Sequence, residues 1–498
     1  MDRVFVTTTD NPQADLSNQV RSAVFWRSGS QIVSQMVMWG ATLAVIRILD
    51  PKDYGLFAMS QVILALLTFL NGYGFASALI QADTVSPKRI RQAFGMLLLL
   101  NGGLAILQLL IAPLAAAYYH QPMVADLLRV QALLYLATPF IALPDVLLSR
   151  ALDFRAQAKA NFAAAIAGAA TALACALSGW GVWTLVAAPI ALFYTRAIAL
   201  TIASGVLVKP SFNFRDSGSM FRFGAAVLLT QFFWIVQSNA DVFIAGRWLT
   251  PHQLGIYAEA LFLTQIFATK FVPPLNDVAF PAYSRLQHDR AAFSWAFTKA
   301  LRIIMLATLP LYVGLAVTAE PVVLTLFGAK WAEMVPLVRI IAFAMPFLTL
   351  QILFAPATNA IGRPGISTWI TGAGAVIMTI AFLIGVRFGA TGLAWAWLTG
   401  FPLYAGVACM MSLPAIGVSW RALGGSIAPG LCAAAAMGAI VWGLDRLLPA
   451  MAPYIRLLLL VSAGGVSYIA LLYIGARQTL DEILHLALRR TPPGTPER

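Results

Sequence analysis

The segment RILDPKDYGLFA, Arg47–Ala58, recurs two hundred positions later as RWLTPHQLGIYA, Arg247–Ala258. Five residues repeat in register: Arg47/Arg247, Leu49/Leu249, Pro51/Pro251, Gly55/Gly255 and Ala58/Ala258. In each copy an apolar stretch leads into a Pro-containing turn, and a second apolar stretch follows. We interpret each copy as a hairpin between two helices, and the repetition predicts a chain built from two related halves.

The composition is typical of a membrane protein. Of the 498 residues, 60% are hydrophobic and only 11% are charged, whereas soluble domains average about 25% charged residues. The mean hydropathy is +0.80. Apolar stretches of ~20 residues, which suffice to cross a bilayer, fill nearly the whole chain. The predicted fold class is therefore all-α and polytopic.

Apolar runs between turn signals predict about fourteen transmembrane helices. They span roughly residues 30–48, 56–80, 93–118, 127–148, 160–178, 183–207, 223–246, 254–275, 299–321, 336–358, 367–386, 391–412, 424–445 and 455–475. The loops between them are short, and the longest is expected around residues 276–298.

Basic residues indicate the topology. With the N-terminus placed in the cytoplasm, roughly two-thirds of the 33 Lys and Arg residues fall in cytoplasmic segments, as the positive-inside rule requires. The net charge of +13 is therefore a topology signal, and no nucleic-acid partner is expected. We predict a multi-pass protein with both termini in the cytoplasm and the lipid bilayer as its surroundings.

Two further echoes support the repeat. The pattern Arg129…Pro139-Phe140…Arg155 returns as Arg339…Pro346-Phe347…Arg363, and the turn at 179–183 returns loosely at 389–395. Three echoes in one order predict two parallel six-helix lobes plus two extra C-terminal helices, an architecture that recurs in transporters. The predicted parts are a cytoplasmic segment 1–29, an N-lobe 30–207, a linker 208–222, a C-lobe 223–412, two helices within 413–475 and a cytoplasmic tail 476–498, in which 480–490 favours a short interfacial helix.

The sequence carries no sign of catalysis. It contains no GxxxxGK[ST] phosphate loop, no Ser/His/Asp arrangement and no spacing of metal ligands. No outer loop is large enough for a polymerase or glycosyltransferase site. We therefore expect neither an enzyme nor a cofactor nor a metal.

Four cations are candidates for binding an anionic substrate. Arg196 lies about midway along its helix, where an ionisable residue marks either a function or an ion pair. One interpretation is that Arg196 faces a cavity and binds an anion. The other is structural: Arg196 forms an ion pair or caps backbone carbonyls at a kink beside Pro189. Lys270 either faces a cavity or extends to the head groups. Arg47 and Arg247 stand at outer helix ends, where a turn-forming role competes with substrate binding.

Three polar residues around the second copy are candidates for ion or proton coupling. Asp241 and Asn239 lie near the outer end of one helix, and Glu259 begins the next. The equivalent positions of the first copy are apolar: Ala41, Trp39 and Met59. One half thus carries charge that the other lacks. The alternative is that Asp241 or Glu259 pairs with Arg247.

Several segments together resemble a known family. Residues 47–81, residues 239–263 with 278–287, and GWGVWTLVA at 179–187 are similar to segments of the Wzx-type oligosaccharide flippases. These belong to the multidrug/oligosaccharidyl-lipid/polysaccharide exporter superfamily. The resemblance implies two six-helix bundles around a hydrated, often cationic cavity. It assigns no residue, and many members have twelve helices where we predict fourteen.

The function that the resemblance implies is flipping of undecaprenyl-pyrophosphate-linked oligosaccharide repeat units across the bacterial inner membrane. This would serve exopolysaccharide synthesis, with a polysaccharide polymerase or export machinery as a further partner. Two alternatives stay open at this point: a peptidoglycan-precursor (lipid II) flippase, and a drug or cation antiporter. The antiporter would be expected to carry a carboxylate deep in the first helix, where this chain has Gln35.

Overall fold

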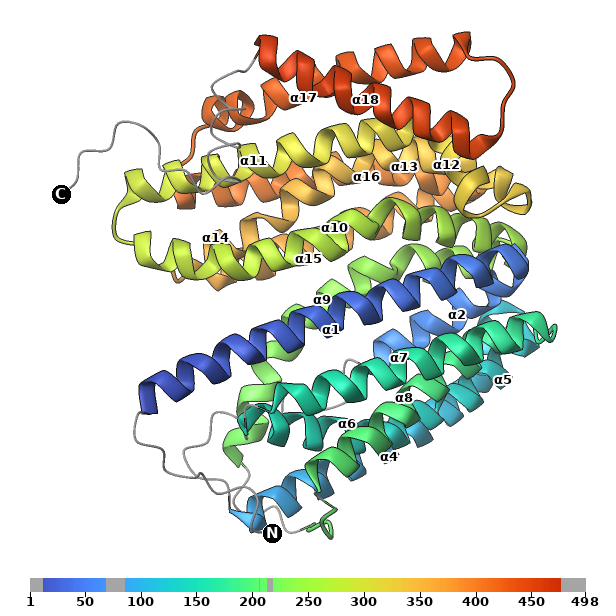
Figure 1. Ribbon diagram of the computed structural model, residues 1–498, viewed down its shortest axis with the longest axis vertical. Helices are drawn as coiled ribbons and strands as arrows, with labels where there is room; N and C mark the ends of the chain where they lie inside the picture. The colour runs from blue at the N-terminus through green and yellow to red at the C-terminus, as the bar shows by residue number, and fades with distance from the viewer. Residues whose placement is uncertain (1–11, 69–85, 152, 206, 213–217, 476–498) are drawn as a thin grey trace. The chain divides into compact units, whose positions relative to one another are not determined.

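The computed structural model describes residues 12–68, 86–151, 153–205, 207–212 and 218–475 (Figure 1). Throughout these ranges the regular structure is helical. Ten helical stretches within them are long and apolar enough to cross a membrane, and several of these, such as Pro364–Ile416, join more than one helix. The predicted fold class, an all-α polytopic membrane protein, is confirmed. The figure of about fourteen crossings stays a prediction, and the predicted tail helix at 480–490 lies outside the described residues.

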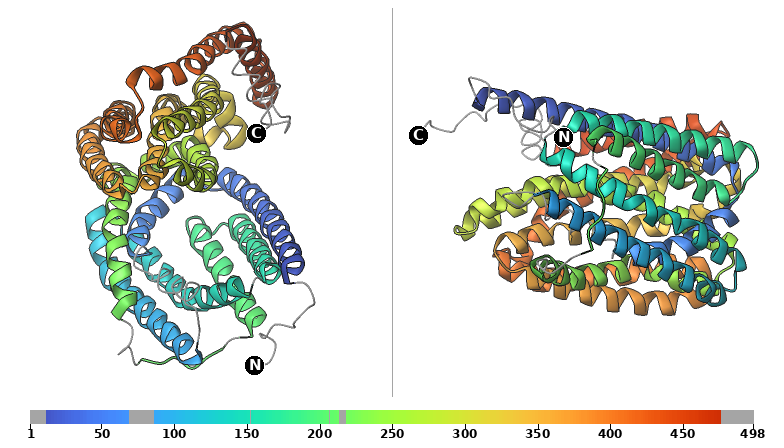
Figure 2. Two further views of the ribbon diagram at one scale, coloured as in Figure 1. Left: turned by 90° about the vertical axis from the view of Figure 1, so that its left-hand side faces the viewer. Right: turned by 90° about the horizontal axis from the view of Figure 1, so that it is seen from below.

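The chain separates into two compact units. The first comprises residues 1–235 and 250–255, and the second comprises residues 236–249 and 256–498. Within each unit the helices lie side by side (Figures 1 and 2). Helix α9 (Gly218–Trp248) and helix α10 (Pro251–Leu286) each contribute residues to both units.

Among the described residues, seven further helices belong to the first unit. They are α1 (Pro12–Ile48), α2 (Pro51–Thr68), α4 (Pro87–Tyr119), α5 (Pro122–Gln131), α6 (Leu133–Arg150), α7 (Phe154–Leu177) and α8 (Trp183–Ser204). The remaining elements of the second unit are α11 (Arg290–Val317), α12 (Ala319–Leu326), the 3₁₀ turn η1 (Ala329–Met334), α13 (Val335–Ile352), α14 (Phe354–Ala360), α15 (Pro364–Gly385), η2 (Val386–Phe388), α16 (Gly389–Ile416), α17 (Trp420–Leu447) and α18 (Pro453–Gly475).

The repeated segment forms the same helix hairpin twice. One helix ends at residue 48 or 248, and the next begins at Pro51 or Pro251. Proline suits the first helical position because its missing N–H would have no intrahelical partner there. In the second copy Thr250 and Gln253 cap the new helix reciprocally, at 3.2 and 3.3 Å, which is a capping box. The interpretation of the motif as a hairpin is confirmed.

The two copies also contact each other within the first unit. A Cβ atom added to Gly55 would fall on the carbonyl oxygen of Pro251, and one added to Gly255 would fall on that of Pro51. The contact is therefore reciprocal and made backbone to backbone. Only glycine permits such an approach, because any side chain would separate the two helix starts.

The predicted loop at 276–298 is wrong. Helix α10 continues to Leu286, and α11 begins at Arg290. Helix α10 passes through Pro273, Pro274 and Pro281 without ending. Tertiary contacts sustain the helix: the Asn276 amide donates to the Ile352 carbonyl oxygen at 3.2 Å. Helices in membranes tolerate proline where neighbouring groups satisfy the freed backbone.

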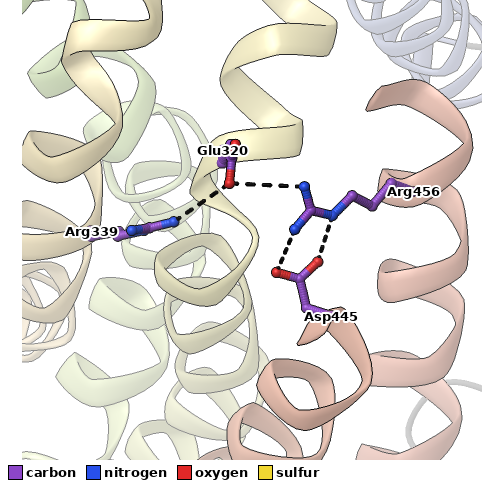
Figure 3. A network of polar contacts seen from close by, with 4 residues as sticks. All are labelled: Glu320, Arg339, Asp445 and Arg456. Carbon is purple, nitrogen blue, oxygen red and sulfur yellow. Dashed lines mark hydrogen bonds and ion pairs between the residues drawn. The ribbon is translucent and has the colours of Figure 1, made fainter. Parts of the chain in front are cut away.

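The two C-terminal helices pack onto the second unit. The Tyr468 hydroxyl of α18 donates to the Leu306 carbonyl oxygen of α11 at 2.7 Å. Arg456 of α18 holds Asp445 of α17 through two hydrogen bonds, at 2.7 and 2.9 Å. Figure 3 shows that Glu320 of α12 completes this network, 3.8 Å from Arg456. The extra helices are thus tied to the second unit by buried and ionic contacts.

Candidate functional site

The first polar site lies in the first unit, where α8 packs against α6. Small residues allow this close packing, since Ala137 of α6 and Ala197 of α8 share one buried cluster. Beside them the Arg196 Nη2 atom lies 3.8 Å from the Asp145 Oδ1 atom. Each of the two side chains keeps 31% of its surface exposed. They form an ion pair that the protein only partly covers.

This pair leaves the Arg196 guanidinium incompletely satisfied. Its Nε atom is buried without a hydrogen-bond partner among the described residues, and a guanidinium has five N–H donors. A charge-assisted hydrogen bond measures about 2.7–2.9 Å, so the contact to Asp145 is a loose one. The ion-pair alternative is therefore what the structure shows. Anion binding by the remaining donors stays a prediction.

The second polar site lies in the second unit, among α9, α10 and α16. Asp241 is 1% exposed, and its Oδ2 atom accepts a 2.8 Å hydrogen bond from the Tyr257 hydroxyl. The Trp397 indole N–H donates to the same hydroxyl at 2.8 Å. Because an indole can only donate, the hydroxyl hydrogen of Tyr257 is directed at the carboxylate. Tyr257 thus links the Asp241 carboxylate of α9 to the Trp397 indole of α16.

One helical turn from Asp241, α9 and α16 make a second polar contact. Gln237 precedes Asp241 by four residues, and Tyr404 follows Trp397 by seven, so each lies on its neighbour's face. The Tyr404 hydroxyl donates to the Gln237 side-chain oxygen at 3.3 Å. Between the two levels the Phe401 ring stacks on Trp397 with centroids 5.0 Å apart. The Tyr404–Gln237 hydrogen bond thus ties α9 directly to α16, one helical turn from the Asp241 carboxylate.

No basic group among the described residues pairs with Asp241. Its hydrogen-bond partners there are the Tyr257 hydroxyl and the backbone N–H of Val242. Arg247 follows six residues later, which is about 9 Å along the helix axis. The predicted pairing of Asp241 with Arg247 is therefore wrong. A buried carboxylate without a counter-charge is costly, and a proton or a small cation would relieve that cost.

Glu259 and Asn239 do not join this cluster. Each lies two residues from a member of it on the same helix, and a turn of about 200° places them on nearly the opposite face. Glu259 is half-buried, and its Oε2 atom is buried with no hydrogen-bond partner in the described part of the chain. It forms no ion pair there with Arg247 either, so that alternative is wrong too.

The remaining predicted cations lie at exposed positions. Arg47 and Arg247 stand in the last turns of α1 and α9, where the repeated hairpin begins. This place fits a turn-forming role, and substrate binding by either stays a prediction. Lys270 is exposed on α10 beside Phe271, which is also exposed. The protein covers neither, so Lys270 is open to lipid or to a water-filled space.

Sequence reasoning missed the partners of its own candidates. Asp145, Trp397 and Tyr404 carried no signal, because each sits in a helix far along the chain from the residue it contacts. Tyr257 did carry one. It replaces Phe57 of the first copy and so adds a hydroxyl at the one repeat position that reaches the added Asp241.

A comparison with protein families places this chain. The model of a family described as polysaccharide biosynthesis protein matches residues 44–336. That range holds both copies of the hairpin, the Arg196 site and the Asp241 side of the second site.

Individual relatives are similar over much of their length. The chain is 25% identical to the succinoglycan biosynthesis transport protein ExoT of Rhizobium meliloti, over 90% of this chain and 92% of that protein. It is 22% identical to the teichuronic acid biosynthesis protein TuaB of Bacillus subtilis, over 82% and 86%. The lipopolysaccharide biosynthesis protein WzxC of Escherichia coli is 23% identical over 59% of this chain and 60% of its own length.

Solved structures show the fold. The lipid II flippase MurJ, in an inward closed conformation, superposes with a TM-score of 0.73 at 13% identity, covering 93% of this chain and 99% of MurJ. An inward-facing multidrug MATE transporter of the MOP superfamily superposes with a TM-score of 0.59 at 14% identity, covering 76% and 94%. At these identities the likeness is one of fold.

Proposed function

Because this chain belongs to the polysaccharide biosynthesis protein family, we propose that it flips undecaprenyl-pyrophosphate-linked oligosaccharide repeat units across the bacterial inner membrane. The likeness to a succinoglycan transport protein over nine-tenths of the chain supports this. The repeat units would feed an exopolysaccharide or another surface polysaccharide. A polymerase or export machinery on the far side would consume them.

The mechanism we propose is alternating access with the lipid chain left in the bilayer. Arg196 would hold the pyrophosphate or an acidic sugar, exchanging its loose contact with Asp145 for the anion. Its remaining N–H donors suit phosphate oxygens, which guanidinium groups bind through two parallel hydrogen bonds. Release then needs only the return of Asp145 to the same guanidinium.

Coupling to an ion gradient would occur at Asp241. The observation that carries this proposal is a carboxylate 1% exposed whose described partners are neutral donors. A proton or small cation arriving there removes the unpaired charge and weakens the pull on the Tyr257 hydroxyl. The change acts on α9 and α10, the two helices that contribute residues to both units. Binding of a proton or cation at Asp241 would therefore favour one arrangement of α9 and α10 over another.

The test is complementation of a strain from which the gene has been deleted. Wild-type protein should restore polymer and clear lipid-linked repeat unit from the cytoplasmic leaflet. The Asp241→Asn variant should be made at normal level yet leave the repeat unit behind. Undiminished polymer in the deletion strain, with no build-up of lipid-linked repeat unit, would contradict the proposed function.

The same strain separates the alternatives. A peptidoglycan-precursor flippase shares the fold and would be needed for growth even when polymer synthesis is switched off. A drug antiporter would leave polymer intact and alter drug susceptibility. We expect neither result: growth without the polymer pathway should be normal, and drug susceptibility should be unchanged.

A further inference from the structure

A groove runs between α15 and α16 on the outside of the second unit. Its volume is about 690 Å³, within the usual range of about 300–1,000 Å³ for a small-molecule site. Its walls are apolar side chains that the protein leaves largely exposed, such as Ile380, Ile384, Trp395 and Leu403. Most of the groove is hydrocarbon surface, so its occupant must be apolar along most of its length.

Small residues create the groove. Gly385 and Gly392 pack so closely that a Cβ atom on either would fall on the backbone of the other. A Cβ atom on Gly400 would lie 3.1 Å from Ala381 and Met378, so this position is also closely packed. The two helices therefore approach closely along a floor of glycine and alanine, and the large side chains on each side stand up as walls. Thr399 in the wall donates its hydroxyl to the Trp395 carbonyl oxygen at 2.9 Å, which leaves its methyl group for the groove.

One end of the groove is built for an anion. Arg387 is exposed beside Phe388, which lines the groove, and no acidic group among the described residues pairs with it. Helix α16 begins two residues later, and no side chain caps its N-terminus. Thr391 adds a hydroxyl on the first turn, inside the groove. A cation and a hydroxyl beside the start of a helix together favour a phosphate.

The dimensions identify the occupant. From Thr391 to Leu403 the groove follows twelve residues of α16, about 18 Å, close to one leaflet of a hydrocarbon core ~30 Å thick. It runs along the helix axis, as the acyl chains of a bilayer lipid do. A long polyprenyl chain would extend well past it. We propose that this groove binds an anionic phospholipid of the bilayer, with an acyl chain between α15 and α16 and its phosphate at Arg387.

The test uses the full chain in nanodiscs that contain photoreactive phosphatidylglycerol or phosphatidylcholine, with labelled peptides located by mass spectrometry. Phosphatidylglycerol should label α15 and α16 more strongly. Arg387→Gln should lower that labelling about fivefold, because a basic residue near the membrane surface contributes about 1 kcal/mol to anionic lipid binding. Thr399→Trp should lower labelling by both lipids, because the indole fills the groove.

The matched control is Arg363→Gln at the other end of α15, which is also exposed and should leave this labelling unchanged. Size-exclusion profiles and thermal unfolding would confirm that each variant is folded, and Arg387 is exposed enough that its variant should be. Equal labelling by the two lipids, or no effect of Arg387→Gln, would overturn the proposal. So would displacement by a polyprenyl phosphate at concentrations where phosphatidylglycerol fails to compete. These outcomes do not depend on what the protein transports.

Discussion

The two copies of the hairpin differ in chemistry while sharing a backbone. In the first copy Ala41 is 7% exposed and faces no hydroxyl from Phe57. In the second copy these positions are Asp241 and Tyr257, joined by a 2.8 Å hydrogen bond. Two substitutions, sixteen positions apart in each copy, thus act as one. Both copies of the hairpin thus keep the proline turn and the glycine contact. The second copy alone carries a buried carboxylate, Asp241, together with a hydroxyl donor, Tyr257.

Polar contacts in the first copy serve packing. Ser60 donates to the backbone oxygen of Phe57 at 2.7 Å and accepts from the Gln131 amide at 3.0 Å. These groups are neutral, so they tie α2 to α5 without holding a charge. The ionic site of the first unit lies elsewhere, at Arg196. Under the proposed function, anion binding would fall to the first unit and ion coupling to the second.

The shared glycine contact should give the largest effect. Gly55→Val places a branched side chain where the carbonyl oxygen of Pro251 lies, so the two helix starts must separate. We expect a cost above about 4 kcal/mol, in the range reserved for severe steric changes, seen as loss of monodisperse protein on size-exclusion chromatography. Gly102→Ala is the matched control, because nothing lies within 4 Å of the added atom. A Gly55→Val protein as stable as wild type would show that the copies do not meet.

Reverting the second copy to the chemistry of the first should give the next effect. Tyr257→Phe leaves the Asp241 carboxylate and the Trp397 N–H without their partner, at a cost of about 1–3 kcal/mol. Asp241→Ala combined with Tyr257→Phe should cost less than the two single changes added together, because the residues are in contact. Thermal unfolding of the purified variants measures this. Strict additivity would mean that the pair is not coupled. Phe57→Tyr in the first copy, where no carboxylate faces it, should leave transport unaffected.

The anion-binding role of the first unit is tested by breaking its ion pair from each side. Arg196→Gln should reduce transport at least about tenfold, equivalent to about 1.4 kcal/mol. Asp145→Asn should keep most of the transport, since it frees the guanidinium. Polymer yield and the flipping rate in proteoliposomes report both variants. If Arg196→Gln transports normally, Arg196 is structural and the site assignment fails, although the proposed function survives.

The smallest effect is expected at the C-terminal helices, which only the second unit carries. Arg456→Gln removes the double contact with Asp445. Both groups are partly exposed, so the cost should be about 0.5–1 kcal/mol, visible as a small fall in the unfolding midpoint. Arg446→Gln is a suitable control, because Arg446 lies over the Trp442 ring at 3.8 Å outside this network. An Arg456→Gln protein that loses α17 and α18 to proteolysis would mean that the network carries more than this.

Local pattern determined much of this protein. Hydropathy predicted the all-α membrane class, because each span needs its own run of apolar residues. The motif at Arg47–Ala58 predicted the hairpin and its copy, because turn residues act over a few positions. Comparing the two copies also pointed to Asp241, because the equivalent residue of the first copy, Ala41, is uncharged. Local pattern failed at residues 276–298, where packing against α11 and α13 keeps α10 helical as far as Leu286.

Only the tertiary structure decided what the charged residues contact. Tyr257 and Trp397 stand 140 positions apart, and their meeting depends on which faces of α10 and α16 pack together. The same holds for Arg196 and Asp145, which the packing of α8 on α6 brings within 3.8 Å. Hydropathy sets which residues enter the membrane, but it is nearly uniform around such helices and does not say which face meets which. The packing of the helices therefore decides which residue each charged side chain contacts.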